Sequence, residues 1–402
     1  MYKYSAIFIS IILVLFVHFI YRTNVKAISI LIPFVILLLF VSRTQLRLNF
    51  LKINKIDLCC YLLIILGLLW TPHLYYFGQC SVSLYKDNHL FSTSINLLPY
   101  VACILSFLTT SKIYEKTTFT GNTNFYLNAL IIALSTFLIT FILLVSKKSF
   151  VNYFNSNWIA IGLYQTYVFK LIVSKKSNFY TNAIIFILLL FITVVFLESR
   201  SVAGAYIIFI FTIIYINIFK SRSIFIRPVF PLALIISILF TFTISYFLNK
   251  ELNQDLLWFA SKHGKNALNG REVAWSDMWV VFQDYFWIGR GTGFLTVSTS
   301  ISSDFNAAVH NAWLDFGVKH GITGVVLLFV FLCIIGNEFS NNISDKKIII
   351  VKSYLISCII FITFYNNFGY SHFGMQLITW LIIGYGLGRC NMLKKTFILK
   401  NI

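Results

Sequence analysis

The chain has 402 residues, of which 58% are hydrophobic and 11% are charged, and its formal net charge is +19. A soluble domain carries roughly 25% charged residues, so this composition excludes a soluble protein and indicates a polytopic membrane protein. The Lys and Arg residues are scattered at the ends of apolar runs and form no continuous basic face. This distribution argues against nucleic acid as a partner and is typical of membrane topology.

Twelve apolar runs are long enough to predict transmembrane helices, although ten or eleven spans remain possible because several runs are short or polar. Helices are expected because backbone groups cannot be left unpaired in lipid. The first run has no small-residue cleavage site behind it, which predicts a retained span rather than a signal peptide. The runs are 4–21, 27–42, 56–71, 95–111, 125–146, 157–174, 180–197, 202–219, 228–248, 321–337, 348–366 and 373–389.

Loop charge predicts the orientation. If both termini are cytoplasmic, most Lys and Arg of the short loops fall on the cytoplasmic side. The short external loops hold six of them, and Lys147 and Lys148 fit this orientation least well. The six are Arg22, Lys26, Lys86, Lys147, Lys148 and Arg200. The expected organisation is about nine helices in 1–248, one large external loop in 249–320, and about three helices with a basic cytoplasmic tail in 321–402. The fold class is thus an all-α polytopic membrane protein.

The long loop is rich in tryptophan and contains no Pro and no low-complexity stretch. Amphipathic rings at this density favour helices at the membrane interface, in contact with lipid. The segment from Glu272 to Tyr285 reads as such a helix, and Gly289 to Gly293 reads as a flexible turn after it. A purely structural role of the aromatic residues is the alternative. The tryptophans in the loop are Trp258, Trp275, Trp279, Trp287 and Trp313.

Two arginines are candidate anion contacts. Arg200 lies between two apolar runs at the external side, and Arg271 follows Asn269-Gly270 at the start of the predicted loop helix. The planar guanidinium can donate two parallel hydrogen bonds to phosphate oxygens, and a helix N-terminus adds backbone N–H groups. The alternatives are a snorkelling Arg200 or an ion pair with Glu198, and an Arg271 that only faces water.

A histidine stands where the polar loop meets an apolar run. His310, followed by Asn311, is a candidate general base because its unperturbed pKa lies near neutrality. A histidine bonded to a backbone carbonyl is the alternative. His320 competes for the same role but lies deeper, beside Gly321, so a structural role is expected for it. The cysteines form no CxxC pair and no metal-like spacing, and nothing predicts a disulfide.

Four short motifs, in order, resemble those of the O-antigen ligase/polymerase superfamily. Ser199-Arg200-Ser201 resembles its SR element, and Gly270 to Trp275 resembles its GRxxxW box. Gly289 to Phe294 resembles its glycine-rich turn. His310-Asn311, followed after nine residues by Gly321-x-x-Gly324, resembles its His-Asn-x9-GxxG signature.

The resemblance implies a metal-independent GT-C-type glycosyltransferase that needs no cofactor. Its donor would be a glycan on undecaprenyl pyrophosphate. Arg200 and Arg271 would hold the pyrophosphate, and His310 would activate an acceptor hydroxyl. Four further motif residues are implied as supporting residues: Asn311, Arg290, Gly321 and Gly324.

Within the superfamily, the length, span number and single dominant loop resemble O-antigen ligases. The acceptor would be lipid A–core, and the active site would face the periplasm from the inner membrane of a Gram-negative cell. A polymerase of the same superfamily is the first alternative. Such polymerases often carry an RX10G pattern, in which a glycine follows an arginine after ten residues. That pattern is missing here, because Phe211 takes the glycine position after Arg200 and Phe282 takes it after Arg271. A transporter of lipid-linked glycans is the second alternative. It should carry charges within its spans, whereas Lys170 and Lys352 lie near the ends of theirs.

Overall fold

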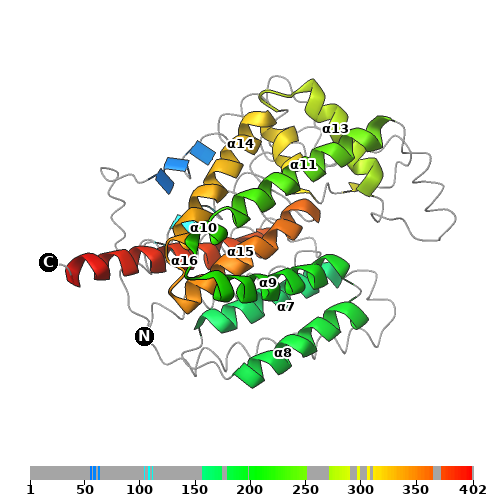
Figure 1. Ribbon diagram of the computed structural model, residues 1–402. Coiled ribbons are helices and arrows are strands. Elements are labelled where there is room, and N and C mark those ends of the chain that lie inside the picture. The colour runs from blue at the N-terminus through cyan, green and yellow to red at the C-terminus, as the bar shows by residue number, and fades with distance from the viewer. Residues whose placement is uncertain are drawn as a thin grey trace, which may run out of the picture.

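The computed structural model describes the chain mainly from residue 156 onward (Figure 1). The described residues are 156–173, 179–197, 199–250, 271–289, 297–298, 306–307, 311–364 and 373–400, together with scattered helical residues between 55 and 111. The first five predicted spans and the loop residues Trp258, Arg290 and His310 lie wholly or mostly outside this set.

The described part is almost entirely helical. Each of the seven spans predicted between residues 157 and 389 corresponds to a helix, and two pairs of residues form a small antiparallel ladder. The elements are α7 Ser156–Val173, α8 Phe179–Phe191, the π-helix η2 Ile192–Phe196, α9 Arg200–Phe219, α10 Ser223–Ile226, α11 Val229–Lys250, α13 Arg271–Asp284, β1 Val297–Ser298, β2 Asn306–Ala307, α14 Ala312–Ser340, α15 Lys346–Phe364 and α16 Phe373–Lys400.

Three helices of the described part are long and apolar enough to cross a membrane: Arg200–Phe219, Ile224–Leu248 and Ala312–Ser340. The apolar helix Tyr180–Phe196 is shorter. The total of twelve spans stays a prediction. One boundary differs from expectation: the span predicted to begin at residue 321 belongs to a helix that begins at Ala312.

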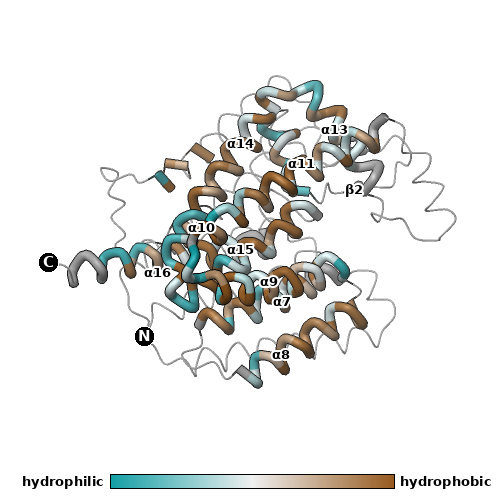
Figure 2. Tube along the Cα trace, in the orientation of Figure 1, coloured by the Kyte–Doolittle hydropathy of each residue, from teal (hydrophilic) through white to brown (hydrophobic). Residues whose placement is uncertain are grey.

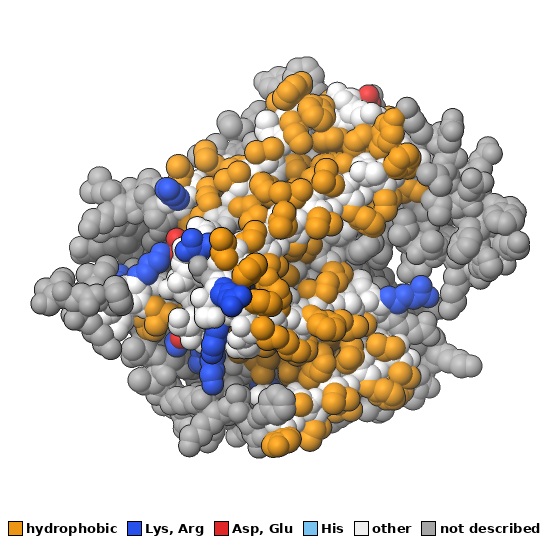
Figure 3. Space-filling model, in the orientation of Figure 1, with side chains coloured by type: hydrophobic (Ala, Val, Ile, Leu, Met, Phe, Trp, Pro, Cys, Tyr) orange, Lys and Arg blue, Asp and Glu red, His pale blue; other side chains and the backbone are white. Residues whose placement is uncertain are grey.

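A broad apolar surface covers the outer sides of α8, α9 and α11 (Figures 2 and 3). Large side chains point outward there, among them Phe211, which is 67% exposed, and Ile236, which is 65% exposed. A water-soluble protein rarely exposes a continuous apolar area of this kind, whereas lipid tails cover it without cost. The described helices are therefore those of a membrane protein.

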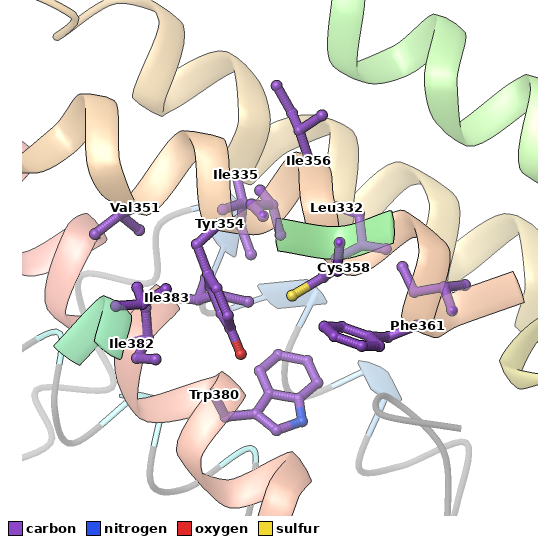
Figure 4. Close-up of a cluster of buried hydrophobic side chains, with 14 of the residues drawn as sticks. Leu332, Ile335, Val351, Tyr354, Ile356, Cys358, Phe361, Trp380, Ile382 and Ile383 are labelled. Carbon is purple, nitrogen blue, oxygen red and sulfur yellow. The ribbon is translucent and has the colours of Figure 1, made fainter. Parts of the chain in front are cut away.

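Helix α15 forms the centre of the bundle and contacts α7, α9, α11, α14 and α16. Its residues 351–358 are buried on every side, as expected of a helix enclosed by others. Figure 4 shows Tyr354 and Cys358 of α15 facing Trp380 of α16 and Leu332 of α14. This core fixes the positions of the helix ends around it.

One end of the bundle is basic and tied together by polar contacts. The Lys352 ammonium donates to the Ile226 carbonyl at 3.2 Å and to Ser340 Oγ at 2.6 Å. Arg389 pairs with Asp345 at 2.7 Å. The segments predicted to be cytoplasmic, 220–227, 341–347 and the start of the tail, therefore lie together. Their exposed cations are Lys220, Arg222, Arg227, Lys346, Lys394 and Lys395.

Candidate active site

Arg200 begins α9 at the end opposite to the basic one. The chain turns sharply before it, since Ser199 N–H donates to the Thr193 carbonyl at 3.1 Å and Ala203 N–H donates to the Ser199 carbonyl at 3.0 Å. The Arg200 side chain is exposed. Unpaired backbone N–H groups and the positive end of the helix dipole surround a residue at this position, which favours an anion. Glu198, its alternative partner, lies outside the described residues.

Arg271 is the first residue of α13, as predicted from the sequence, although its side chain lies outside the description. The helix α13 packs against α11 and α14. Trp275 and Phe282 are buried in a cluster with Leu248 of α11 and Leu314 of α14. Trp275 is thus a core residue, while Trp287, beyond the end of the helix, is 70% exposed. Only the latter ring keeps the surface position expected of a residue at the membrane interface.

Asn311 caps the N-terminus of α14. Its Oδ1 accepts a hydrogen bond from Leu314 N–H at 3.1 Å, and its backbone is extended, with φ −147° and ψ 117°. The amide nitrogen Nδ2 donates to Thr241 Oγ1 of α11 at 3.1 Å and to the Thr363 carbonyl of α15 at 2.8 Å. The residue that follows His310 along the chain is therefore fixed by three helices.

Two glycines of different motifs meet at the bend of α14. Gly321 has φ 66° and ψ −167°, a backbone conformation that is essentially restricted to glycine. A Cβ atom there would lie 2.5 Å from Ile288 N, and one on Gly289, which has φ 75°, would lie 2.5 Å from Gly321 N. The Ile322 N–H, which the bend frees, donates to the Phe286 carbonyl at 2.7 Å. The glycine-rich turn and the GxxG element thus form one backbone joint.

The last motif glycine makes room for His320. A Cβ atom on Gly324 would collide with the His320 side chain one turn earlier. The His320 ring is almost completely buried, and its centre lies 5.5 Å from that of Phe316. This environment agrees with the structural role expected for His320.

Helices α9, α13 and α14 each begin at one of the sequence motifs, and all three begin at the same end of the bundle. Gly204, one turn into α9 from Arg200, faces Ile360 of α15, to whose side chain an added Cβ would lie at 3.3 Å. One turn later, Thr363 of α15 accepts the hydrogen bond from Asn311. Figure 1 shows α13 crossing near the start of α14 at this end. His310 and the Arg271 side chain lie outside the described residues, so no distance joins them to Arg200 or Asn311.

The sequence gives no sign of the residues that hold Asn311. Thr241 and Thr363 stand inside apolar runs, where an isolated hydroxyl is ordinary. Only the folded packing of α11 and α15 against the start of α14 brings them together. No group of three or more His, Cys, Asp or Glu residues occurs among the described residues, and independence of metal stays a prediction.

Comparison with known families identifies this region. Residues 185–329 match the family model described as O-antigen ligase. The match supports a relation of this segment to the O-antigen ligase/polymerase superfamily. The matched segment contains all four motifs, from Ser199 to Gly324. No curated protein and no solved structure matches the chain.

Proposed function

We propose that this protein is an O-antigen ligase. It transfers a glycan from undecaprenyl pyrophosphate to a sugar hydroxyl of lipid A–core, at the periplasmic side of the bacterial inner membrane. The observation that carries the proposal is the O-antigen ligase match over 185–329. It is supported by the common end of the bundle at which α9 and α14 begin.

His310 acts as the general base in this mechanism. It takes the proton of the acceptor hydroxyl while the hydroxyl oxygen attacks the anomeric carbon of the donor glycan. The bond between that carbon and the pyrophosphate oxygen breaks, and undecaprenyl pyrophosphate leaves with the bonding electrons. A positioned base contributes about 10²–10⁴-fold to such a step.

Arg200 and Arg271 stabilise the leaving group. Negative charge builds on the pyrophosphate as the glycosidic bond breaks, so fixed cations and helix N-termini act most strongly in the transition state. Each arginine is the first residue of its helix, where the backbone N–H groups of the first turn have no partner within the helix. Cleavage of the donor supplies the driving force, so ATP is not required.

Transfer by purified protein in detergent, with the lipid-linked donor and lipid A–core, tests this proposal. We expect His310→Ala, Arg200→Ala and Arg271→Ala each to lower the transfer rate at least about 100-fold while the protein still inserts. Arg222→Ala is the matched control, since Arg222 is exposed at the basic end. Unchanged transfer by the three variants would refute the assigned roles.

The same assay separates the alternatives. A polymerase would join repeat units on the lipid carrier and would leave lipid A–core unmodified. A transporter of lipid-linked glycans would form no glycosidic bond in detergent. The buried centre of the described bundle carries hydroxyl and amide groups, such as Gln165 bonded to Thr379 at 2.9 Å and Tyr354 bonded to the same hydroxyl at 2.9 Å. The charged residues buried in the described helices, Lys352 and the pair Asp315 and Lys319, lie toward the ends of the bundle. This favours an enzyme over a transporter, which would carry charges near the middle of its spans.

A further inference from the structure

A second set of hydrogen bonds ties the start of α14 to its neighbours. Trp313 Nε1 donates to Ser237 Oγ at 2.8 Å, and Ser237 Oγ lies 2.5 Å from Thr363 Oγ1. The Thr363 hydroxyl donates to the Ile359 carbonyl at 2.9 Å. Because its single proton is used there, Ser237 must be the donor toward Thr363. The chain therefore runs in one direction, from Trp313 through Ser237 and Thr363 to Ile359.

Thr363 joins this chain to the cap of α14. Its hydroxyl accepts from Ser237, and its carbonyl accepts from Asn311. That carbonyl belongs to the last turn of α15, where carbonyl groups have no partner within the helix. Asn311, Trp313 and Thr241 are completely buried, and Ser237 and Thr363 are 5% exposed. Buried hydrogen bonds are strong, and a partner left unpaired is costly, so this arrangement resists displacement.

We propose that Ser237, Thr241 and Thr363 are positioning residues for the transfer reaction. Thr241 and Thr363 accept hydrogen bonds from the Asn311 side chain, and Ser237 accepts one from Trp313. Together they fix the start of α14, whose cap Asn311 directly follows His310 in the chain. This inference rests on the proposed role of His310 as the base. A displacement of about 1 Å at a reacting group can cost about 10²-fold in rate, so loss of the anchor lowers turnover more than substrate binding.

Hydroxyl deletions test the proposal in the transfer assay. Thr363→Val and Ser237→Ala each break the chain, and we expect kcat to fall about 10-fold with an unchanged KM for the donor. Thr363→Ser keeps the hydroxyl and should retain most of the activity. Ser245→Ala is the matched control, because Ser245 is fully buried on α11 and its hydroxyl has no hydrogen-bond partner in the described part of the chain. Equal kcat for Thr363→Val, Ser237→Ala and Ser245→Ala would overturn the inference.

A measurement that needs no activity separates this proposal from the function itself. His310→Cys, in a background without the native cysteines, reports the freedom of position 310 through its rate of maleimide labelling. We expect Thr363→Val and Ser237→Ala to change that rate and Ser245→Ala to leave it unchanged. If His310→Ala kept full transfer activity, the catalytic role of His310 would be rejected, but the labelling result would still support the anchor at the start of α14. No change in labelling would reject the anchor itself.

Discussion

Gly321 and Gly289 determine how the loop after α13 meets the membrane helix α14. Each has a positive φ, and an added side chain on either would collide with the backbone of the opposite segment. The hydrogen bond from Ile322 to Phe286 closes the same joint. Backbone atoms of two motifs therefore meet with no side chain between them, which explains why both motifs contain glycine there.

Gly321→Ala should lower the free energy of unfolding by about 3 kcal/mol, because backbone strain and a steric collision add. Gly162→Ala provides the control, since an added Cβ at Gly162 on α7 would meet nothing within 4 Å. It should change stability by no more than about 1 kcal/mol. Thermal unfolding of the two purified variants in the same detergent measures the difference. Equal midpoints would contradict the joint described above.

The sequence indicated candidate catalytic residues, whose roles stay predictions, but not the residues that hold Asn311 beside them. Arg271 was placed at a helix start and Arg200 between two apolar runs, and both are the first residues of helices. Asn311 was expected to support His310, but its role as a cap bonded to α11 and α15 was not predictable. The hydrogen bonds that Asn311 donates to Thr241 and Thr363 depend on the packing of segments far apart in the chain, which apolar patterns do not encode.

At the level of elements, the first turns of α14 were assigned to a polar loop and prove to be a buried helix. The segment contains Asp315, Lys319 and His320, which lowered its apolar character below that of a span. The carboxylate of Asp315 and the ammonium of Lys319 lie 2.5 Å apart, one turn from each other on the helix. Pairing makes two charges compatible with burial, so hydropathy alone detected only the helical segment after the bend at Gly321 and missed the one that begins at Ala312.

Asp315→Leu should destabilise the protein by about 3–5 kcal/mol, since Lys319 would keep its charge in a buried site without this partner. The double variant Asp315→Leu/Lys319→Leu should lose much less stability, because no buried charge remains. A double-mutant cycle from thermal unfolding gives the coupling between the two residues. Additive effects would show that the pair does not stabilise α14.

The turn between α14 and α15 is held by Asp345. Burial alone would raise the pKa of this carboxyl, but hydrogen bonds from Arg389 and from the backbone of Lys347 and Ile348 outweigh it and lower the pKa below its usual value. A lowered pKa in the folded state means that the contribution to stability is present above about pH 4, the unfolded value, and is lost as the pH falls through the folded value.

Asp345→Asn should therefore unfold at a lower temperature than the original protein at pH 7. The difference between the two should shrink as the pH falls below about 4, where Asp345 becomes protonated. Lys346→Gln is a suitable control, since Lys346 is exposed beside the same turn. A difference that stays constant down to pH 3 would exclude the ion pair with Arg389 as its source.

At the scale of the molecule, the described part has two chemically different ends, and its visible face is apolar between them (Figure 3). Exposed cations gather where α9, α14 and α16 end, whereas Arg200 and Asn311 lie at the other end. Positive charge marks the cytoplasmic side of membrane proteins. The orientation predicted from loop charge requires this asymmetry, and the periplasmic position of the active site stays a prediction.

Cysteine labelling of intact cells tests the orientation. In a background without native cysteines, Arg200→Cys should react with a membrane-impermeant maleimide reagent, and Arg222→Cys should react only after the inner membrane is permeabilised. Both residues are exposed, so access to the reagent depends on the side of the membrane. Reaction of both cysteines from the same side would rule out the proposed topology.

The lipopolysaccharide of a strain that lacks this protein tests the central claim most directly. An O-antigen ligase catalyses the step that joins the finished glycan to lipid A–core. We therefore expect electrophoresis of the lipopolysaccharide to show bare core without any attached repeat unit. Expression of the original chain should restore the long chains, and expression of His310→Ala should not. Core capped with a single repeat unit would instead indicate a polymerase, and an unchanged ladder of long chains would contradict the account altogether.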